Sequence, residues 1–198
     1  MVTTTEPGTD GRPRRLIVGI SGASGAIYGI RLLELARRAG IETHLIVSTA
    51  ARTTIDLETG RTLAEVEALA DRVYRNDDFA AACASGSFQT LGMVIAPCSV
   101  KTMGEIASGV TASLMSRSAD VTLKERRRLV LMLRETPLHL GHIRAMASVT
   151  EAGAIVYPPV PAFYARPATI AEMIDHTLGR VLDLFGIDVG TAHRWGES

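Results

Sequence analysis

The segment 15–38, RLIVGISGASGAIYGIRLLELARR, constrains the fold more than any other part of the chain. Leu16–Ile20 is a short, uniformly apolar run, which is typical of a strand buried on both faces. Three glycines stand at every third position, Gly19 within this run and Gly22 and Gly25 after it, and an amphipathic pattern begins at the residue after Gly25. A buried strand that turns directly into a helix is the first half of a βαβ unit, so the segment predicts a parallel sheet.

The N-terminus of this predicted helix carries free N–H groups and the positive end of the helix dipole, both directed into the glycine turn. Such a turn binds phosphate or another anion. The spacing Gly19-x-x-Gly22-x-x-Gly25 differs from the G-x-G-x-x-G of dinucleotide-binding folds. Close packing of strand against helix is the alternative explanation for the glycines, so the turn by itself indicates only an anion at the end of the first strand.

Four further apolar runs alternate with helical patterns along the rest of the chain. We expect these strands at 42–47, 93–96, 129–133 and 154–157. We expect helices near 26–39, 63–70, 101–108, 138–152 and 170–185. Strands separated by helices require right-handed crossovers. The expected fold class is therefore α/β, a doubly wound parallel sheet in a Rossmann- or flavodoxin-like three-layer sandwich.

The composition is that of one globular domain. The chain has 198 residues, of which 46% are hydrophobic, and its 21 basic and 21 acidic residues cancel, which argues against a nucleic-acid or membrane-surface binder. Two cysteines, Cys83 and Cys98, fit a reducing compartment better than a disulfide scaffold. No apolar run reaches the roughly 20 residues of a membrane span. We expect a disordered tail at 1–13, without a signal peptide's apolar core, and a single cytoplasmic domain at 14–198.

Polar residues follow the predicted strands at their carboxyl ends, where a doubly wound sheet binds its ligands. Hydroxyl groups follow three of them: Ser24 after the first, Ser48 after the second, and Ser99 with Thr102 after the third. Capping of the next helix also explains Ser99 and Thr102. Three hydroxyl-bearing strand ends suit a ligand that has both a phosphate and a polyol or heterocycle, such as flavin mononucleotide (FMN).

A second set of residues carries charge. Lys124 and Arg134 bracket the fourth predicted strand, whereas the run Arg126–Arg128 fits a solvated surface. Together with the hydroxyl of Tyr164, two or three cations can hold a second phosphate through charge-assisted hydrogen bonds. Glu58, in the segment LETG, is either a surface carboxylate or a group that transfers protons beside a bound flavin.

Other chemistries have less support in the sequence. Asp77 and Asp78 have no acidic partner one turn later, so a magnesium-binding diphosphate cluster is not indicated. His139 and His142 supply only two local zinc ligands and fit a turn or a helix cap better. Cys98 lies between an apolar run and a helix, a position that fits a small buried packing residue better than a nucleophile. We therefore predict no metal site.

Taken together, these motifs resemble those of the UbiX-type flavin prenyltransferases, within the flavin-binding cysteine-decarboxylase superfamily. The similarity runs from about residue 15 to residue 196, through GISGASGAIYG, LETG, SGSF, PCSVKT, SADVTLKERR, RETPLHLGH and PPVPAFY. The resemblance implies a flavin-binding domain at 14–198 that works without a metal. It implies an enzyme that joins the dimethylallyl group of dimethylallyl phosphate to nitrogen 5 and carbon 6 of reduced FMN.

The resemblance also assigns roles to residues, motif by motif. It implies that FMN is bound by Gly22, Ala23, Ser24, Ser48, Ser99, Val100, Lys101, Thr102 and Arg134. It implies that dimethylallyl phosphate is bound by Tyr164, Arg180, Lys124, Arg117 and Glu135. It implies that catalysis depends on Glu58, Ser24 and Lys124.

Partners follow from the same resemblance. It implies a homo-oligomer, a dodecamer with sites shared between subunits, in which Tyr164 and Arg180 serve a neighbour's flavin. It implies that the product, prenylated FMN, is the cofactor of partner UbiD-type decarboxylases of aromatic or unsaturated acids, including one in ubiquinone biosynthesis.

Two alternatives remain at this point. An FMN-dependent cysteine-type decarboxylase would carry a catalytic histidine and a Pro-Ala-Ser-Ala-Asn-Thr segment, where this chain has APCSVKT at 96–102. An FMN-binding carrier or subunit would not need Lys124, Tyr164 and Arg180, so binding of a prenyl phosphate distinguishes the carrier from the enzyme.

Overall fold

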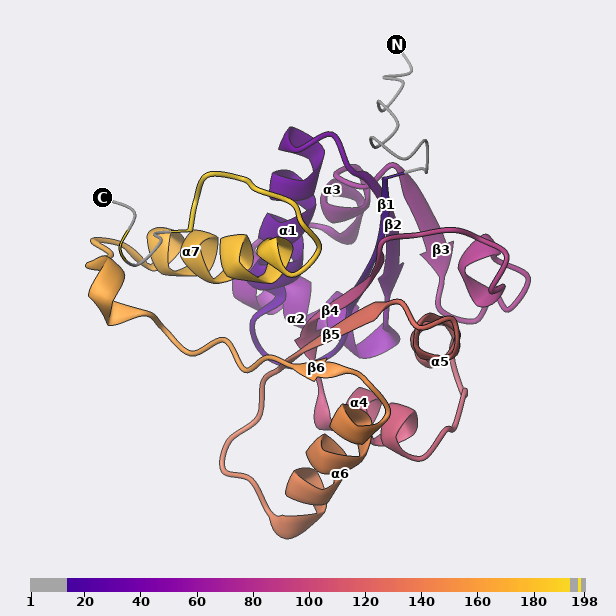
Figure 1. Cartoon of the computed structure of the whole chain (residues 1–198). Helices are drawn as coiled ribbons and strands as arrows, with labels where there is room; N and C mark the ends of the chain where they lie inside the picture. Colours follow the sequence, from indigo (N-terminus) through magenta and orange to yellow (C-terminus); the bar gives the residue numbers. More distant parts are fainter. Residues whose placement is uncertain (1–13, 193–195, 197–198) are drawn as a thin grey trace.

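A six-stranded sheet, parallel throughout, runs through the middle of the computed structural model, which describes residues 14–192 and residue 196 (Figure 1). The strands are β1 (Arg15–Ile20), β2 (Glu42–Val47), β3 (Arg72–Arg75), β4 (Gly92–Cys98), β5 (Arg128–Leu133) and β6 (Ile155–Val156). Their order in the sheet is β3-β2-β1-β4-β5-β6, so the order reverses between β1 and β4. This pair is the topological switch point, and the predicted fold class is confirmed. The tail predicted at 1–13 lies outside the described residues.

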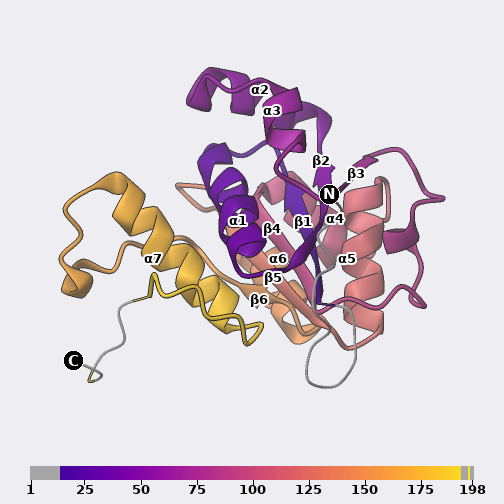
Figure 2. The same cartoon turned by 90° about the horizontal axis from the view of Figure 1, so that it is seen from above.

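Helices cover both faces of the sheet (Figure 2). One face carries α1 (Ala26–Arg38) and α7 (Ile170–Asp183). The other carries α4 (Val100–Ala107), α5 (Leu114–Lys124) and α6 (Leu140–Glu151). Between β2 and β3 lie α2 (Thr49–Thr59) and α3 (Leu63–Glu67), and the 3-10 helices are η1 (Ala82–Ala84) and η2 (Phe163–Ala165). Within the described ranges, no helix combines the length and apolar character needed to cross a bilayer.

The strands supply two hydrophobic cores, one on each face. In β1, Leu16 and Val18 pack toward α1 and α7, whereas Ile17 packs toward the layer of α4, α5 and α6, where it joins Met103 and Met115. All five of these side chains are at most 3% exposed. Because both faces are covered, the strands read as continuous apolar runs rather than alternating ones.

Among the described α-helices and strands, three have no counterpart in the prediction, namely α2, α5 and β3, and the two short 3-10 helices were not predicted either. The edge strand β3 has the sequence RVYR and is mostly exposed, so no apolar run marks it. Helix α2 is rich in threonine and buries only Ala51 and Ile55, which gives it a weak helical pattern. The other elements begin and end within a few residues of the predicted bounds.

A cluster of polar side chains around the buried His44 connects β1, β2 and β3 near the amino ends of β1 and β2. His44 is only 2% exposed, and its ring nitrogens lie 2.9 Å from the Tyr74 hydroxyl and 3.1 Å from the Glu42 carboxylate. Glu42 in turn accepts a hydrogen bond from Arg15 at 3.0 Å. Desolvation lowers the pKa of His44 below its ordinary value, although the Glu42 charge opposes this. The neutral imidazole is therefore the form that the folded protein favours.

This cluster predicts an acid-sensitive stability. The folded chain binds the His44 proton more weakly than the unfolded chain does, so stability should fall as the pH drops from about 6.5, the unfolded value, toward the lower folded-state pKa. Melting temperatures between pH 7.5 and pH 5 measure this slope. The slope should flatten in His44→Phe and persist in the control His139→Asn, at an exposed helix cap; an equal slope in all three proteins would remove His44 as its source.

Candidate active site

Most of the residues predicted to bind FMN meet at the carboxyl edge of the sheet. Ser24 lies in the turn after β1, and the Ser48 hydroxyl caps α2 by accepting a hydrogen bond from the Ala51 N–H at 3.2 Å. Ser99 caps α4 in the same way through the Thr102 N–H at 3.2 Å, which confirms the capping alternative for this pair. The backbone of Arg134, directly after β5, donates to the Cys98 carbonyl at 3.1 Å. The ends of β1, β2, β4 and β5 thus surround the switch point.

Two glycines of the turn have distinct steric roles. A Cβ at Gly22 would collide with the Cβ of Ala50 in α2, so close packing accounts for this glycine. Gly25 has a φ of 101°, a left-handed conformation that favours glycine, and a Cβ there would lie 2.7 Å from Nη1 of Arg134. The absence of a side chain at Gly25 therefore lets the Arg134 guanidinium lie directly on the turn.

The anion predicted at the N-terminus of α1 is the protein's own carboxylate. Oε2 of Glu58, in the last turn of α2, accepts hydrogen bonds from the N–H groups of Gly25 at 2.7 Å and Ala26 at 3.1 Å. The Ser24 hydroxyl is also hydrogen-bonded to this carboxylate. Glu58 thus takes the position that a phosphate occupies in other glycine turns.

The surroundings of Glu58 keep it ionised. Desolvation raises the pKa of Glu58, but the hydrogen bonds from Gly25, Ser24 and Ala26, together with the charge of Arg134, outweigh it and lower the pKa below its ordinary value. At neutral pH the group is a carboxylate that can accept a proton.

A cavity of about 430 Å³ opens beside this turn. Its walls include Ser24, Tyr28, Arg134, Glu135 and the proline-rich segment 158–161. The guanidinium of Arg134 lies 5.9 Å from the centre of the Tyr28 ring. The volume falls within the range of roughly 300–1,000 Å³ typical of small-molecule sites.

Sequence reasoning missed Tyr28 and the segment 158–161. Tyr28 lies three residues after Gly25, so its place in the first turn of α1 was the available signal. The segment PPVP follows β6, at the same edge of the sheet as the other strand ends. Neither signal places its residue at the cavity until the strand order is known, because the cavity is lined by residues that follow β1, β5 and β6.

The structure does not bring Lys124 near this cavity within one chain. Lys124 ends α5 beside Gly86 and pairs with Glu125, near the amino ends of β4 and β5, whereas Arg134 follows the carboxyl end of β5. The six residues of β5 separate the two by roughly 17 Å of strand. Arg117 lies in the first turn of the same helix, paired with Asp120 at 3.0 Å.

Tyr164 and Arg180 gather on the α7 side. Burial raises the pKa of Tyr157, the Arg180 charge lowers it and Tyr164 raises it, so the three groups lie close enough to interact. Tyr164, in η2, also packs edge-on against His176 with ring centres 5.8 Å apart. Arg180 pairs with Asp183 at 2.7 Å.

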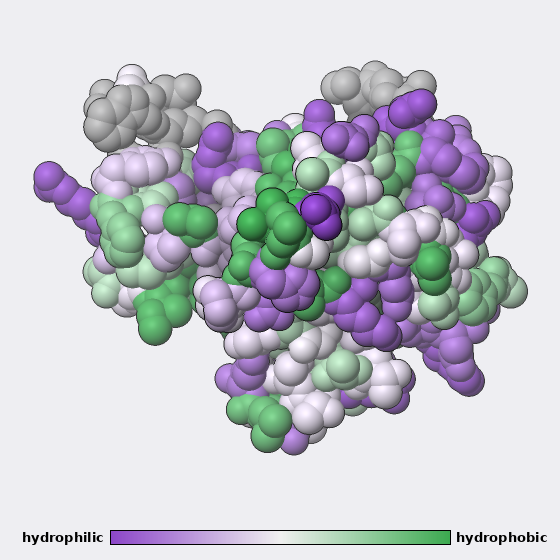
Figure 3. All heavy atoms as spheres, turned by 90° about the horizontal axis from the view of Figure 1, so that it is seen from below, coloured by the Kyte–Doolittle hydropathy of each residue, from purple (hydrophilic) through white to green (hydrophobic). Residues whose placement is uncertain are grey.

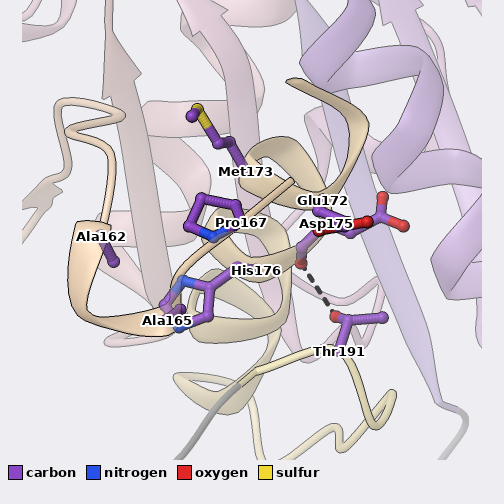
Figure 4. A pocket seen from close by; sticks show the side chains of 8 residues that line it. All are labelled: Ala162, Ala165, Pro167, Glu172, Met173, Asp175, His176 and Thr191. Carbon is purple, nitrogen blue, oxygen red and sulfur yellow. Dashed lines mark hydrogen bonds between the residues drawn. The ribbon is translucent and has the colours of Figure 1, made fainter. Parts of the chain in front are cut away.

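A second cavity, of about 280 Å³, lies between η2 and α7 (Figure 4). Ala162, Ala165 and Pro167 line one side, and Asp175 and His176 of α7 line the other. Nε2 of His176 has no hydrogen-bond partner among the residues that the structure describes. This cavity holds none of the residues predicted to bind FMN.

Of the remaining predicted residues, Lys101 lies away from the residues that line the cavity, whereas Glu135 belongs to its wall. Lys101 is 86% exposed and lies 3.5 Å from Glu105, next to Val100 in the first turn of α4. Glu135 lies on the cavity wall and accepts a hydrogen bond from the Thr136 N–H at 3.0 Å. Both are solvent-facing.

The alternative roles weighed for cysteine and histidine are also resolved. Cys98 is fully buried, which raises the pKa of its thiol to about 12 and fits a packing residue. His139 caps α6 by accepting hydrogen bonds from the Gly141 and His142 N–H groups. Across residues 14–192 and 196, no three His, Cys, Asp or Glu side chains form a metal-binding group.

Comparison with known proteins identifies close relatives. The model of the Flavoprotein family matches residues 4–182. The flavin prenyltransferase UbiX of Escherichia coli (strain K12) is 59% identical over 175 residues, which cover 88% of this chain and 93% of that protein.

Two solved structures are similar over nearly the whole chain. A crystal structure of AnUbiX (PadA1) in complex with FMN and dimethylallyl pyrophosphate has a TM-score of 0.92 at 50% identity, covering 94% of this chain and 100% of that one. A crystal structure of a dodecameric FMN-dependent UbiX-like decarboxylase from Escherichia coli O157:H7 has a TM-score of 0.89 at 46% identity, covering 91% of this chain and 98% of that one.

Proposed function

Because the chain belongs to the Flavoprotein family and, within it, to the UbiX flavin prenyltransferases, we propose that it transfers the dimethylallyl group of dimethylallyl phosphate to reduced FMN. The observation that carries this proposal is the ionised Glu58, held with Ser24 and Arg134 beside the cavity at the switch point. The bonds expected to form are to nitrogen 5 and carbon 6 of the flavin.

The residues present fit a flavin. The carboxyl edge offers hydroxyl groups at Ser24, Ser48 and Ser99, a guanidinium at Arg134 and an open cavity of suitable volume. The N-terminus of α1 is already neutralised by Glu58, whereas the N-termini of α2 and α4, which follow β2 and β4, are available to attract the FMN phosphate. The solved relative in complex with FMN and dimethylallyl pyrophosphate supports this assignment.

The proposed chemistry gives each residue one task. Reduced flavin, when bound, would supply an electron-rich ring as the acceptor of the allylic group. Glu58, as a carboxylate held by the Ser24 hydroxyl, would accept the proton that nitrogen 5 loses when the first bond forms and phosphate leaves. The second bond, to carbon 6, requires a proton to be added to the prenyl double bond and the proton on carbon 6 to be removed, and Glu58 would serve this exchange as well. Cations and a tyrosyl hydroxyl stabilise the charge that grows on the leaving phosphate. We assign this second task to Lys124, Arg180, Tyr164 and Arg117.

We propose that Lys124 acts in a neighbouring subunit's site, since its own chain places it at the opposite edge of the sheet. Exposed apolar side chains offer surfaces for such contacts: Phe163 is 71% and Ile170 76% exposed, and Leu140, in α6, is 58% exposed. Apolar residues also gather near the middle of the face on the side of α6 (Figure 3). The dodecameric relative supports an oligomer, and we propose a dodecamer with shared sites.

The use of the product is part of the proposal. We propose that this prenyltransferase acts in the cytoplasm and supplies prenylated FMN to a UbiD-type decarboxylase of aromatic or unsaturated acids, such as one in ubiquinone biosynthesis. The supporting observation is the relationship to the UbiX proteins.

The direct test is an anaerobic incubation of the purified protein with reduced FMN, with and without dimethylallyl phosphate, followed by mass spectrometry of the extracted flavin. We expect a gain of one C₅H₈ unit that requires protein and both substrates. Unmodified FMN, from protein shown to bind it, would favour a flavin carrier and contradict the proposal.

A further inference from the structure

Ser21, the last residue before the glycine turn, makes a pair of buried hydrogen bonds that link β1 to β4. Its side chain is 0% exposed. Its hydroxyl donates to the Pro97 carbonyl at 2.8 Å and accepts from the Ser99 N–H at 2.7 Å. One hydroxyl therefore uses its donor and one acceptor position on two residues that lie more than 70 positions away in sequence.

These bonds act at the junction where β4 turns into α4. Ser99 is the N-cap of α4, and its own hydroxyl accepts from the Thr102 N–H and lies 3.1 Å from the Thr102 hydroxyl. The Ser99 N–H thus donates to Ser21 while the Ser99 hydroxyl caps the helix, so the cap residue itself is held by Ser21. The position and direction of the start of α4 thus depend on the Ser21 hydroxyl.

The same junction borders the switch point. The Ser21 N–H also donates to the Pro97 carbonyl, at 3.2 Å, and Gly22–Ser24 follow directly in the turn that meets Glu58. Ser21 therefore fixes the distance between two groups of proposed FMN ligands, the turn after β1 and the N-terminus of α4.

We propose that Ser21 is a positioning residue for FMN: it does not touch the flavin but holds Ser99 and Thr102 opposite the glycine turn. Loss of the hydroxyl leaves the Ser99 N–H without its acceptor in a partly buried place, and the junction must move to satisfy it. This inference rests on the proposed flavin site.

The test compares Ser21→Ala with Thr122→Val in the full-length protein. Thr122 is 1% exposed and donates to the Ser118 carbonyl within α5, so the control also removes one buried hydroxyl, but away from the carboxyl edge. The dissociation constant of FMN, titrated without prenyl donor, should rise about 10- to 100-fold in Ser21→Ala, the range found when groups behind metal ligands are removed. It should stay within about twofold of the parent value in Thr122→Val, within ordinary context variation.

Kinetics separate positioning from simple loss of folded protein. Partial unfolding lowers the apparent kcat and leaves KM unchanged, whereas a displaced ligand raises the KM for reduced FMN with little change in kcat at saturation. Adding Ser99→Ala to Ser21→Ala should weaken FMN binding no further than Ser99→Ala alone, because both act through one junction.

Equal FMN affinity in Ser21→Ala and Thr122→Val, or fully additive losses in the double variant, would overturn the inference. If Ser21→Ala does not fold, Ser21→Cys keeps a weaker donor and acceptor in the same place. Its FMN dissociation constant should then lie between the parent value and the roughly 10- to 100-fold rise expected for Ser21→Ala. The FMN titration needs no prenyl transfer, so a failure of the proposed transferase activity leaves this result readable on its own.

Discussion

Glu58→Gln should lower turnover about 10²- to 10⁴-fold, the usual contribution of a positioned acid–base group, while FMN binding stays nearly unchanged. Glutamine keeps an oxygen that can accept from the Gly25 and Ala26 N–H groups, so the N-terminus of α1 stays capped. What the variant loses is the negative charge that makes Glu58 a proton acceptor. Single-turnover formation of prenylated FMN, beside an FMN titration, measures both parts of this expectation.

A matched control lies on the same helix. Asp56 is also an exposed carboxylate of α2, so Asp56→Asn removes one negative charge and should leave turnover close to that of the parent protein. Parent-like turnover in Glu58→Gln would eliminate Glu58 from the proton transfer. Loss of FMN binding in that variant would instead assign Glu58 to the binding of the flavin.

Lys124→Ala should lower turnover about 10²- to 10³-fold through weaker stabilisation of the leaving phosphate. If Lys124 serves a neighbouring subunit's site, an equal mixture of the Lys124→Ala and Glu58→Gln proteins that is refolded together regains prenyl-transfer activity. Random assembly gives about a quarter of the sites both an intact Glu58 from one chain and an intact Lys124 from another. Each variant refolded alone keeps only its own lowered turnover, and the mixture is assayed at the same total protein concentration.

The mixing experiment has two clear contrary results. No recovery in the mixture, with oligomers of normal size, would mean that Glu58 and Lys124 must come from the same chain. Full turnover in Lys124→Ala would assign the residue to the solvated surface. Arg126→Asn, which removes a neighbouring charge at a residue whose φ of 57° suits asparagine, is the control and should remain active.

The buried parts of the fold were predictable because burial leaves a direct mark on sequence. The bounds of β2 agree with the prediction to the residue, since all but its first residue are buried. Elements without an apolar mark were missed: β3 is exposed, and α2 presents mainly polar and β-branched residues. Helix α5 was missed although it is buried, because its buried residues include Ser116, Ser118 and Thr122, which weaken the apolar pattern. Their positions follow from tertiary contacts that no local pattern records.

The sequence was enough to predict which polar residues follow each strand, but not which side chains from different elements come together at the site. Ser24, Ser48, Ser99 and Arg134 each follow a strand, and the parallel sheet brings these ends to one edge. Lys124 precedes the strand that Arg134 follows, so the two flank β5 from opposite edges. The occupant of the anion position at α1 was also missed, because Glu58 reaches it from a helix that the pattern did not indicate.

The strand order has a consequence for synthesis of the chain. The half-sheet β3-β2-β1 is complete once residue 75 has left the ribosome, but the other neighbour of β1, β4, begins only at Gly92. Until then β1 is an apolar edge strand with open hydrogen-bonding groups, the kind of edge that recruits strands of other chains. FMN, whose proposed ligands come from both halves, favours the completed sheet by mass action. Supply of flavin during expression should therefore increase the yield of native protein, as well as fill the site.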